Sequence, residues 1–505
     1  MPESSSALLE KACDHVRRTA LWASIEGLLG WDERTMLPTA ASPHRAEQMT
    51  MLASVIHRRR TDPQLGERLA ELAESPLAAD PYSDAGATIR RLKRDYDRAT
   101  RLPVPLVEEL TRTAVLGQHV WQEAREQNDF ARFRPLLEKT VRLKREEADA
   151  LGIGRCRYDA LLDRYEPETS TEQAAAMLAG LRAPLVALIE AIRGSGREPP
   201  TAVLKRPFPL AAQEAFGRAV AAEIGFDFAR GRLDVTAHPF CAEAGPHDCR
   251  ITTRYDEHYL PMALFGILHE AGHGLYDQGL DADAYGLPLG SPVSLGIHES
   301  QSRLWENQVG RSRAFWAHVY PRLKQQFPGM LDDASGDDFH FAVNAVVPST
   351  IRVDADEATY NLHIIVRFEL EQALIDDRLA VADLPSAWNA AYREHLGVEV
   401  PNDAEGVLQD IHWSGGSFGY FPTYTLGNLY AAELYAAAES ELGGLDAQLA
   451  RGEFRPLLEW LREKVHRQGQ RYPAAELVAR VAGRPPSHAP LIDYLRGKLA
   501  PLYGL

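Results

Sequence analysis

Cysteine is scarce in this chain of 505 residues, which contains only Cys13, Cys156, Cys241 and Cys249. Four cysteines are too few for a disulfide framework, and their spacing matches no common zinc signature. Cys241 and Cys249 are close enough in sequence to pair across a hairpin. We nevertheless expect reduced thiols, as in a cytosolic protein.

Uninterrupted apolar runs are also missing. The closest approach, residues 174–192, is interrupted by Arg182, Pro184 and Glu190, so it falls short of the roughly 20 apolar residues that span a bilayer. The N-terminal segment, residues 1–15, lacks the basic region and apolar core of a secretory signal. We therefore expect a cytoplasmic location and no membrane partner.

Basic residues are fewer than acidic ones, with 55 Lys and Arg against 71 Asp and Glu, which gives a net charge of −16. This balance disfavours a phosphate-binding surface, so no nucleic-acid partner is expected. The 45% of apolar and 25% of charged residues are typical of a globular protein and exclude a disordered chain.

The periodicity of the chain is mainly helical. Residues 105–150 carry apolar positions at three- and four-residue spacing, and Ser170-x-x-Gln173 predicts a capping box at a helix start. The breaker-rich stretch 194–200 reads as a loop inside one large domain. We therefore predict a mainly α protein with a single domain over residues 1–505.

Two short runs have strand character, residues 232–240 and 248–255, both rich in Val, Ile, Thr and aromatic residues. Gly245 and Pro246 lie between them, so these runs predict a β-hairpin. The pair stands just before the most informative helix of the chain.

That helix contains His269-Glu270-Ala271-Gly272-His273 after an apolar run. Two histidines at i and i+4 lie on one helical face, so both imidazoles can bind one cation, and zinc accepts such ligands at about 2.0–2.1 Å. Glu270 is placed beside the metal, where it can accept a proton from water and deliver it to a leaving amine.

A catalytic zinc ion needs a third protein ligand. Glu299 begins another amphipathic stretch after a turn-rich connection, residues 290–296, that can reverse the chain and bring it opposite the histidines. Glu306 is the competing candidate, and we interpret it as an exposed helix charge. The predicted metal ligands are therefore His269, His273 and Glu299, with Zn²⁺ as the cofactor and Co²⁺ as a substitute.

Further motifs in the same order complete a resemblance to a known family. The motifs are Gly30-Trp31-Asp32 with Met36 and Pro38, His238-Pro239-Phe240, Asp248–Thr252, His298–Gln301, Ile351–Asp356 and Gly406–Trp413. Together with His269–His273, they make the chain similar to the carboxypeptidase Taq family of zinc metallocarboxypeptidases over most of its length.

The resemblance implies a helical fold with a deep cleft and a small sheet, related in architecture to neurolysin and angiotensin-converting enzyme. It implies that residues 1–505 form a single catalytic domain with its zinc site within residues 238–424. It also implies release of single residues from peptide C-termini with broad preference, poor action on C-terminal proline, and a homodimer. The expected partners are thus peptides with a free C-terminus and a second copy of the chain.

Hydrolysis of a peptide bond also needs donors for the developing oxyanion. Residues 412–424 offer three such side chains beside a Gly-Gly pair, and the family architecture favours Tyr424 and His412, with Tyr420 in reserve. Alternatively, each tyrosine belongs to an aromatic loop that packs into the core.

An exopeptidase must bind the free carboxylate of its substrate, and a guanidinium does so with paired hydrogen bonds. The sequence offers four candidates, Arg250, Arg254, Arg303 and Arg352. The resemblance favours Arg352. Asp354 and Asp356 are expected to hold Arg352 or a ligand histidine in place, and the alternative is an ordinary surface ion pair.

The predicted hairpin has a further use, because an extended peptide can add to an exposed sheet edge. Residues 248–253 are the expected edge, with Arg250 and His238 as substrate contacts. Two other functions stay open, a zinc oligopeptidase that cuts internal bonds and a non-catalytic peptide-binding protein of the same fold.

Overall fold

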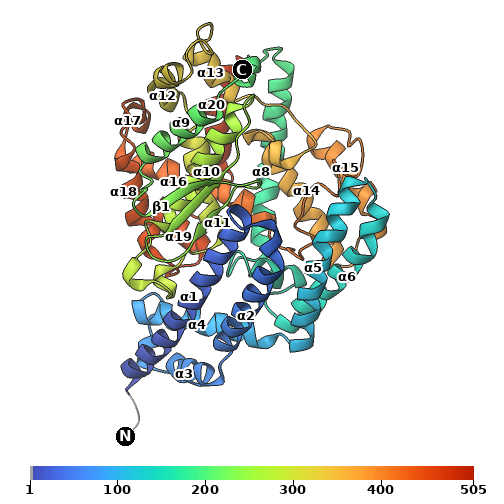
Figure 1. Ribbon diagram of the computed structural model, residues 1–505, viewed down its shortest axis with the longest axis vertical. Coiled ribbons are helices and arrows are strands. Elements are labelled where there is room, and N and C mark those ends of the chain that lie inside the picture. The colour runs from blue at the N-terminus through green and yellow to red at the C-terminus, as the bar shows by residue number, and fades with distance from the viewer. Residues whose placement is uncertain (1–3) are drawn as a thin grey trace. The chain divides into compact units, whose positions relative to one another are not determined.

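The computed structural model describes residues 4–505, which divide into two compact units (Figure 1). Of the described residues, the first unit comprises 4–100, Pro200–Val343 and Ala431–Pro485, and the second comprises Arg101–Pro199, Asn344–Tyr430 and Pro486–Leu505. The described chain is mainly helical with one small sheet, which confirms the predicted fold class. Residues 1–3 of the segment predicted to lack an export signal lie outside the described residues.

The chain passes from the second unit into the first at Pro199 and Pro200, inside the predicted loop 194–200. That the two units act as one catalytic domain stays a prediction.

The first unit is built from helices around a small sheet. Its N-terminal helices share a core in which Leu65, Leu69 and Leu72, one face of a helix, pack with Leu8 and Ala12. The helices of this unit are α1 (Ser5–Thr35), α2 (Ser42–Arg60), α3 (Pro63–Ala73), α4 (Asp84–Arg101), α9 (Leu210–Glu223), α10 (Leu260–Asp277), α11 (Leu295–Arg303), α12 (Arg313–Gln326), α13 (Gly336–Val343), α17 (Leu445–Ala450), α18 (Arg455–Lys464) and α19 (Ala474–Ala482).

The sheet has the strand order β1-β3-β2, with β1 (Gly231–Val235), β2 (Cys241–Glu243) and β3 (Cys249–Thr253). The two predicted strands exist, but they run parallel and Gly231 pairs with Cys249, so the predicted hairpin between them is wrong. The antiparallel partner of β3 is the three-residue β2 between them. Because β3 has neighbours on both sides, the prediction that it offers a free edge is also wrong.

Helix α10 forms the centre of the first unit, where it packs against β3, α9 and α11. Its apolar run is buried as predicted, and Pro261 opens it at a position where no backbone N–H is needed. A methyl group added at Gly272 would lie 2.6 Å from Ser302 Cα. Glycine at this position therefore allows α11 to approach the face of α10 that carries the histidines.

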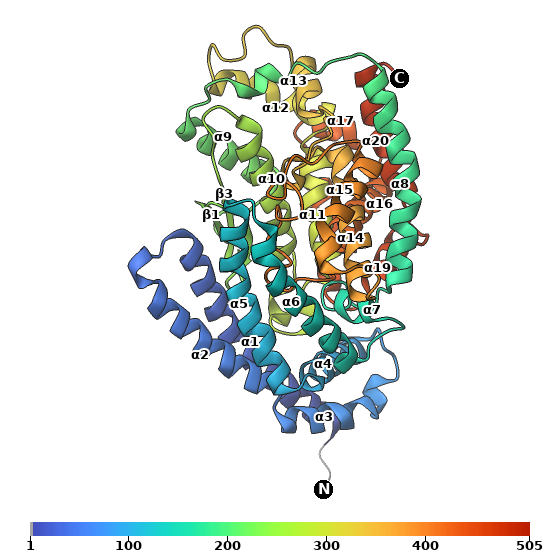
Figure 2. The ribbon, with the colours of Figure 1, turned by 90° about the vertical axis from the view of Figure 1, so that its right-hand side faces the viewer.

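The second unit is an assembly of long helices. The predicted helical stretch 105–150 forms two helices that pack side by side, because the chain turns at Asn128 with φ 53° and Asp129 caps the second (Figures 1 and 2). The helices of this unit are α5 (Val104–Glu126), α6 (Phe130–Leu151), α7 (Arg157–Leu162), α8 (Thr171–Gly194), α14 (Glu357–Ile375), α15 (Leu384–Leu396), the first part of α16 (Pro422–Leu442) and α20 (Ala489–Tyr503).

Helix α8 begins at the predicted capping box, in which Ser170 accepts from Gln173 N and the Gln173 side chain accepts from Ser170 N. Within residues 4–505 it is the one helix with the length and composition of a membrane span. It packs against α14 and α20 within its unit, as Figure 2 shows for α20, and buries Leu181 and Leu185 completely. In all, 33% of the most apolar stretch of α8 is buried, so the helix buries one face against its neighbours.

Candidate metal centre and associated polar residues

His269 and His273 lie one turn apart on α10, and both direct Nε2 at the same carboxylate. Glu299 Oε2, from α11, is 3.6 Å from His269 Nε2 and 3.5 Å from His273 Nε2. A tetrahedral zinc ion with bonds of about 2.0–2.1 Å to nitrogen and oxygen separates two of its ligand atoms by about 3.4 Å. The three side chains meet as the sequence predicted, and their two separations from Glu299 Oε2 are close to that spacing, so the group is a candidate zinc ligand set.

Glu299 is held in place by its own helix. Ser294 caps α11 by accepting from Ile297 N at 3.1 Å, and Ser302 Oγ donates to Glu299 Oε2. Arg303 donates from Nε to Glu299 Oε1 at 2.7 Å. Although burial alone would raise the pKa of Glu299, Arg303 and the imidazoles hold that pKa well below its ordinary value. The carboxylate is thus charged and oriented for a cation.

Glu306 is not the exposed helix charge that the sequence suggested. It lies in a π-helix, η6 (Leu304–Val309), that continues α11, and it is 8% exposed. Glu306 Oε2 is 2.9 Å from His269 Nδ1 and accepts from Arg303, and Oε1 accepts from Arg311. A proton on Nδ1 leaves the lone pair of His269 Nε2 free for a metal.

His273 is oriented by two residues that sequence reasoning missed, His298 and Asp277. His273 Nδ1 lies 2.5 Å from His298 Nδ1, and His298 Nε2 lies 3.0 Å from Asp277 Oδ1. When His298 donates to Asp277 in its neutral form, His273 donates to His298 and keeps Nε2 for the metal. Asp277 could have been predicted from the sequence, because it follows His273 by four residues and so lies one helical turn away on the same face.

Glu270 points from α10 into a buried environment and is 6% exposed. Burial raises its pKa from the usual 4.5 to about 7. A carboxyl group with such a pKa can exchange a proton near neutral pH, which a general base or acid requires. The residue next to the candidate ligand His269 is therefore a buried carboxyl group with a pKa near neutrality.

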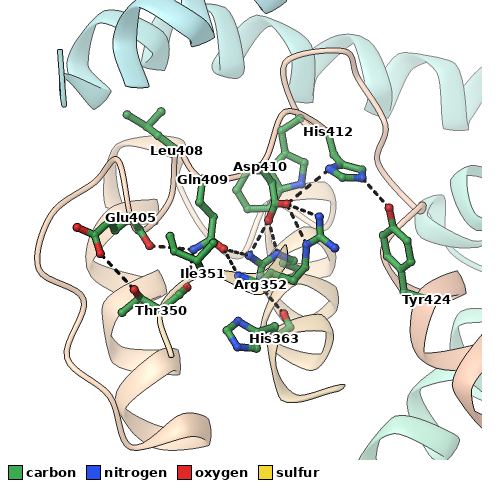
Figure 3. A network of polar contacts seen from close by, with 12 residues as sticks. Thr350, Ile351, Arg352, His363, Glu405, Leu408, Gln409, Asp410, His412 and Tyr424 are labelled. Carbon is green, nitrogen blue, oxygen red and sulfur yellow. Dashed lines mark hydrogen bonds and ion pairs between the residues drawn. The ribbon is translucent and has the colours of Figure 1, made fainter. Parts of the chain in front are cut away.

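A second cluster of polar residues lies within the second unit, around Asp410 (Figure 3). Asp410 Oδ1 accepts from Arg352 Nε at 2.9 Å and Nη2 at 2.7 Å, and Oδ2 accepts from Arg367 Nε at 2.7 Å. Gln409 Oε1 accepts from Arg352 N and Arg367 Nη2, both at 2.8 Å. Burial opposes the charge on Asp410, but the two guanidinium groups outweigh it and hold its pKa far below the ordinary value.

The expected partners of Arg352 are therefore wrong, because Asp410 holds it instead of Asp354 or Asp356. Asp354 is exposed, and Asp356 caps α14 by accepting from Ala358 N and Thr359 N. Arg352 itself is 6% exposed. An Asp 58 residues away in the chain gives no local signal by which sequence reasoning could have found it.

The predicted oxyanion donors are neighbours in the second unit. Tyr424 OH lies 3.3 Å from His412 Nε2, and the Arg352 guanidinium lies 5.1 Å from the centre of the Tyr424 ring. Burial lowers the pKa of His412 to about 4, so its imidazole is neutral at physiological pH. Tyr420 also contacts this group, with its ring centre 5.2 Å from that of His412.

The other residues predicted to contact the substrate, His238 and Arg250, lie outside the two polar clusters described above. His238 is exposed in the loop between β1 and β2. Arg250 donates to Asp248 in two hydrogen bonds of 2.8 Å and lies over the ring of Trp31 at 4.3 Å. Arg303 is engaged by the metal-centre carboxylates, which makes it a poor carboxylate anchor.

Comparison with known proteins agrees with this geometry. A family model described as carboxypeptidase Taq (M32) metallopeptidase matches residues 11–499. The chain is 48% identical over 508 positions to thermostable carboxypeptidase 1 of Thermus thermophilus, covering 99% of each protein. It is 38% identical over 490 positions to carboxypeptidase 1 of Bacillus subtilis, covering 97% of each.

Among solved structures, the M32 carboxypeptidase of Deinococcus radiodurans R1 is similar, with a TM-score of 0.95 and 43% identity over 99% of this chain and 100% of that one. These findings confirm the family resemblance seen in the motifs, and with it a metal cofactor and peptide substrates. The chain belongs to the carboxypeptidase Taq (M32) family of metallopeptidases and is a metallocarboxypeptidase, a peptide hydrolase.

Proposed function

We propose that the protein is a zinc carboxypeptidase that removes single residues from peptide C-termini with broad preference and acts poorly on C-terminal proline. The observation that carries the choice of metal is the convergence of His269 Nε2 and His273 Nε2 on Glu299 Oε2, which lies 3.6 Å and 3.5 Å from them. The donor set of two imidazoles and one carboxylate is typical of catalytic zinc.

In this proposal the proton transfers belong to Glu270. A bound divalent ion polarises the scissile carbonyl and acidifies water. Glu270 accepts the proton of the attacking water and later delivers it to the amine that leaves. Its pKa of about 7 supports both directions, because such a group gains and loses a proton at similar cost near neutral pH.

Stabilisation of the oxyanion is assigned to residues of the second unit. Tyr424 OH and the neutral His412 are the proposed donors, and Tyr420 remains the reserve. A buried donor that loses no water during the reaction is worth more than the same donor in solvent. The 3.3 Å contact between His412 and Tyr424 supports a joint role, because each orients the other.

Arg352 is the proposed anchor for the terminal carboxylate of the substrate. A guanidinium has five N–H groups, and Arg352 uses three of them on Asp410 and Tyr360, which leaves two for a ligand. Asp410 then acts as a positioning residue that fixes the plane of the guanidinium. Contacts from Arg250 and His238, a homodimer and a cytoplasmic location are further parts of the proposal, and these rest on the sequence and its family resemblance.

Mass spectrometry of a mixed peptide pool tests the proposal most directly. With the enzyme we expect ladders shortened one residue at a time from the C-terminus, and with a chelator no shortening. C-terminally amidated copies of the same peptides are the matched control and should resist cleavage. Equal cleavage of amidated peptides at internal bonds would identify an oligopeptidase instead, and zinc content without any cleavage would identify a binding protein.

A further inference from the structure

Three further metal-ligand side chains meet in the first unit, apart from the His269–His273–Glu299 set. They are Cys241 on β2, Cys249 on β3 and Asp277 at the end of α10. Cys241 Sγ lies 3.6 Å from Cys249 Sγ and 3.5 Å from Asp277 Oδ2. Cys249 is 3% exposed, and both thiols are free.

The sheet register explains why these thiols meet without forming a disulfide. Cys241 is opposite Ile251 and Cys249 is opposite Glu243, so the two cysteines are diagonal neighbours across β2 and β3. Cα atoms of diagonal neighbours are about 7–8 Å apart, whereas a disulfide needs about 4.4–6.8 Å. Two cysteines in these positions are therefore better placed to bind one ion between them than to form a disulfide.

The spacing of the three atoms matches a tetrahedral ion. Bonds of about 2.3 Å to sulfur and about 2.0 Å to oxygen separate two sulfur ligands by about 3.8 Å and a sulfur from an oxygen by about 3.5 Å. The observed separations of 3.6 Å and 3.5 Å are close to these edges. Cys249 and Asp277 also line a surface pocket, which gives the fourth position to water.

We propose that Cys241, Cys249 and Asp277 bind a second divalent ion of the zinc type, separate from the catalytic one. Two thiolates and a carboxylate form a softer ligand set than the catalytic imidazoles and carboxylate, so this site favours thiophilic ions. Binding converts two thiols to thiolates, and two protons leave to solvent for each ion bound. Because these protons are released on binding, the affinity for the ion increases with pH.

The second site is connected to the catalytic ligands through Asp277. While Oδ2 faces Cys241, Oδ1 is 3.0 Å from His298 Nε2, and His298 in turn contacts His273 at 2.5 Å. An ion bound by Asp277 therefore fixes the carboxylate that orients His298. The thiolate site itself does not depend on the proposed function of the first site, whereas this connection does.

Cobalt provides the test, because thiolate ligands give Co²⁺ an intense charge-transfer band in the near ultraviolet that imidazole and carboxylate ligands lack. The full chain, reduced and stripped of metal, is titrated with Co²⁺ while absorbance and metal content are measured. We expect a second ion per chain and the thiolate band. Cys249→Ser and Cys241→Ser should each lose the band and one ion, whereas Cys156→Ser, at an exposed cysteine, should keep both.

The same titration in a His269→Ala background separates the two sites. The thiolate band should persist there even though the proposed catalytic ligand set is broken, so failure of the catalytic proposal leaves this result unchanged. The absence of the band from the reduced wild-type chain, or an equal cobalt content in wild type and Cys249→Ser, overturns the proposal. So does a Cys241–Cys249 disulfide that reforms in preference to metal binding.

Discussion

His269 Nδ1 lies 2.9 Å from Glu306 Oε2, and this contact defines the role of the imidazole. With its proton directed at Glu306, His269 presents a lone pair from Nε2 toward Glu299. The negative charge of Glu306 also increases the basicity of the ring as a ligand. In the proposed zinc site, Glu306 is thus a positioning residue for His269 and not one of the proposed ligands.

Replacing Glu306 with Gln should weaken metal binding without removing a ligand. The amide keeps the size of the carboxylate and loses its charge, so we expect affinity for Zn²⁺ to fall about 10–100-fold. Competition with a chromophoric chelator measures the change. Glu198→Gln, at an exposed loop carboxylate, is the control and should bind as wild type. Unchanged affinity in Glu306→Gln would show that the contact does not tune the ligand.

Substitution of Glu270 should separate catalysis from metal binding. Glu270→Gln keeps the side-chain volume but cannot accept a proton, so kcat should fall about 10²–10⁴-fold with metal content unchanged. His269→Ala should instead lose the metal, measured by elemental analysis. Substantial hydrolysis by Glu270→Gln would remove this residue from the role of base.

The sequence predicted that His269, His273 and Glu299 meet because two simple rules were sufficient for this grouping. The i, i+4 spacing placed His269 and His273 on one face, and a turn-rich connection returned the chain so that Glu299 came opposite them. Glu306 was misjudged because a charged helical residue is usually exposed. Its position seven residues after Glu299, two turns along, was the neglected signal.

Errors elsewhere came from contacts that local patterns do not encode. The predicted hairpin failed because β2, which lies between β1 and β3 in sequence, has only three residues, too few to show alternation. With β2 unrecognised, nothing indicated that β1 and β3 pair in parallel. Asp410 was missed as the partner of Arg352 because the two residues meet only through tertiary packing. Acidic residues adjacent in sequence were chosen instead.

Gly272 makes the metal centre sensitive to a single methyl group. In Gly272→Ala the new Cβ would lie 2.6 Å from Ser302 Cα and 2.7 Å from Gln301 O, so α10 and α11 must separate. We expect a loss of about 1–3 kcal/mol in the free energy of unfolding, together with weaker metal binding. Gly497→Ala is the matched control, because no atom lies within 4 Å of a Cβ built at this position in α20. It should be neutral or stabilising by up to about 1 kcal/mol. Equal behaviour of the two variants, by urea unfolding, would contradict the close approach.

Burial of His412 predicts a specific dependence of stability on pH. Burial, together with the charges of Arg352 and Arg367, lowers the pKa of its imidazole from 6.5 to about 4 against the opposing effect of Asp410. Between pH 6.5 and pH 4, His412 is therefore protonated in the unfolded chain and neutral in the folded chain. Stability from this group is complete above pH 6.5 and is lost as the pH falls toward 4, by up to about 3 kcal/mol.

His412→Gln isolates this contribution, because glutamine cannot titrate while Asp410 and Glu371 titrate in both proteins. Urea unfolding of the two proteins between pH 7.5 and pH 4, a range of about 3.5 units that brackets both values, gives the difference. The free energy of unfolding of the wild type should fall more steeply than that of the variant below pH 6.5, and the two curves should run parallel above it. Parallel curves throughout would mean that His412 binds its proton as readily in the folded chain as in the unfolded chain. The proposal that its imidazole stays neutral between pH 6.5 and pH 4 would then be wrong.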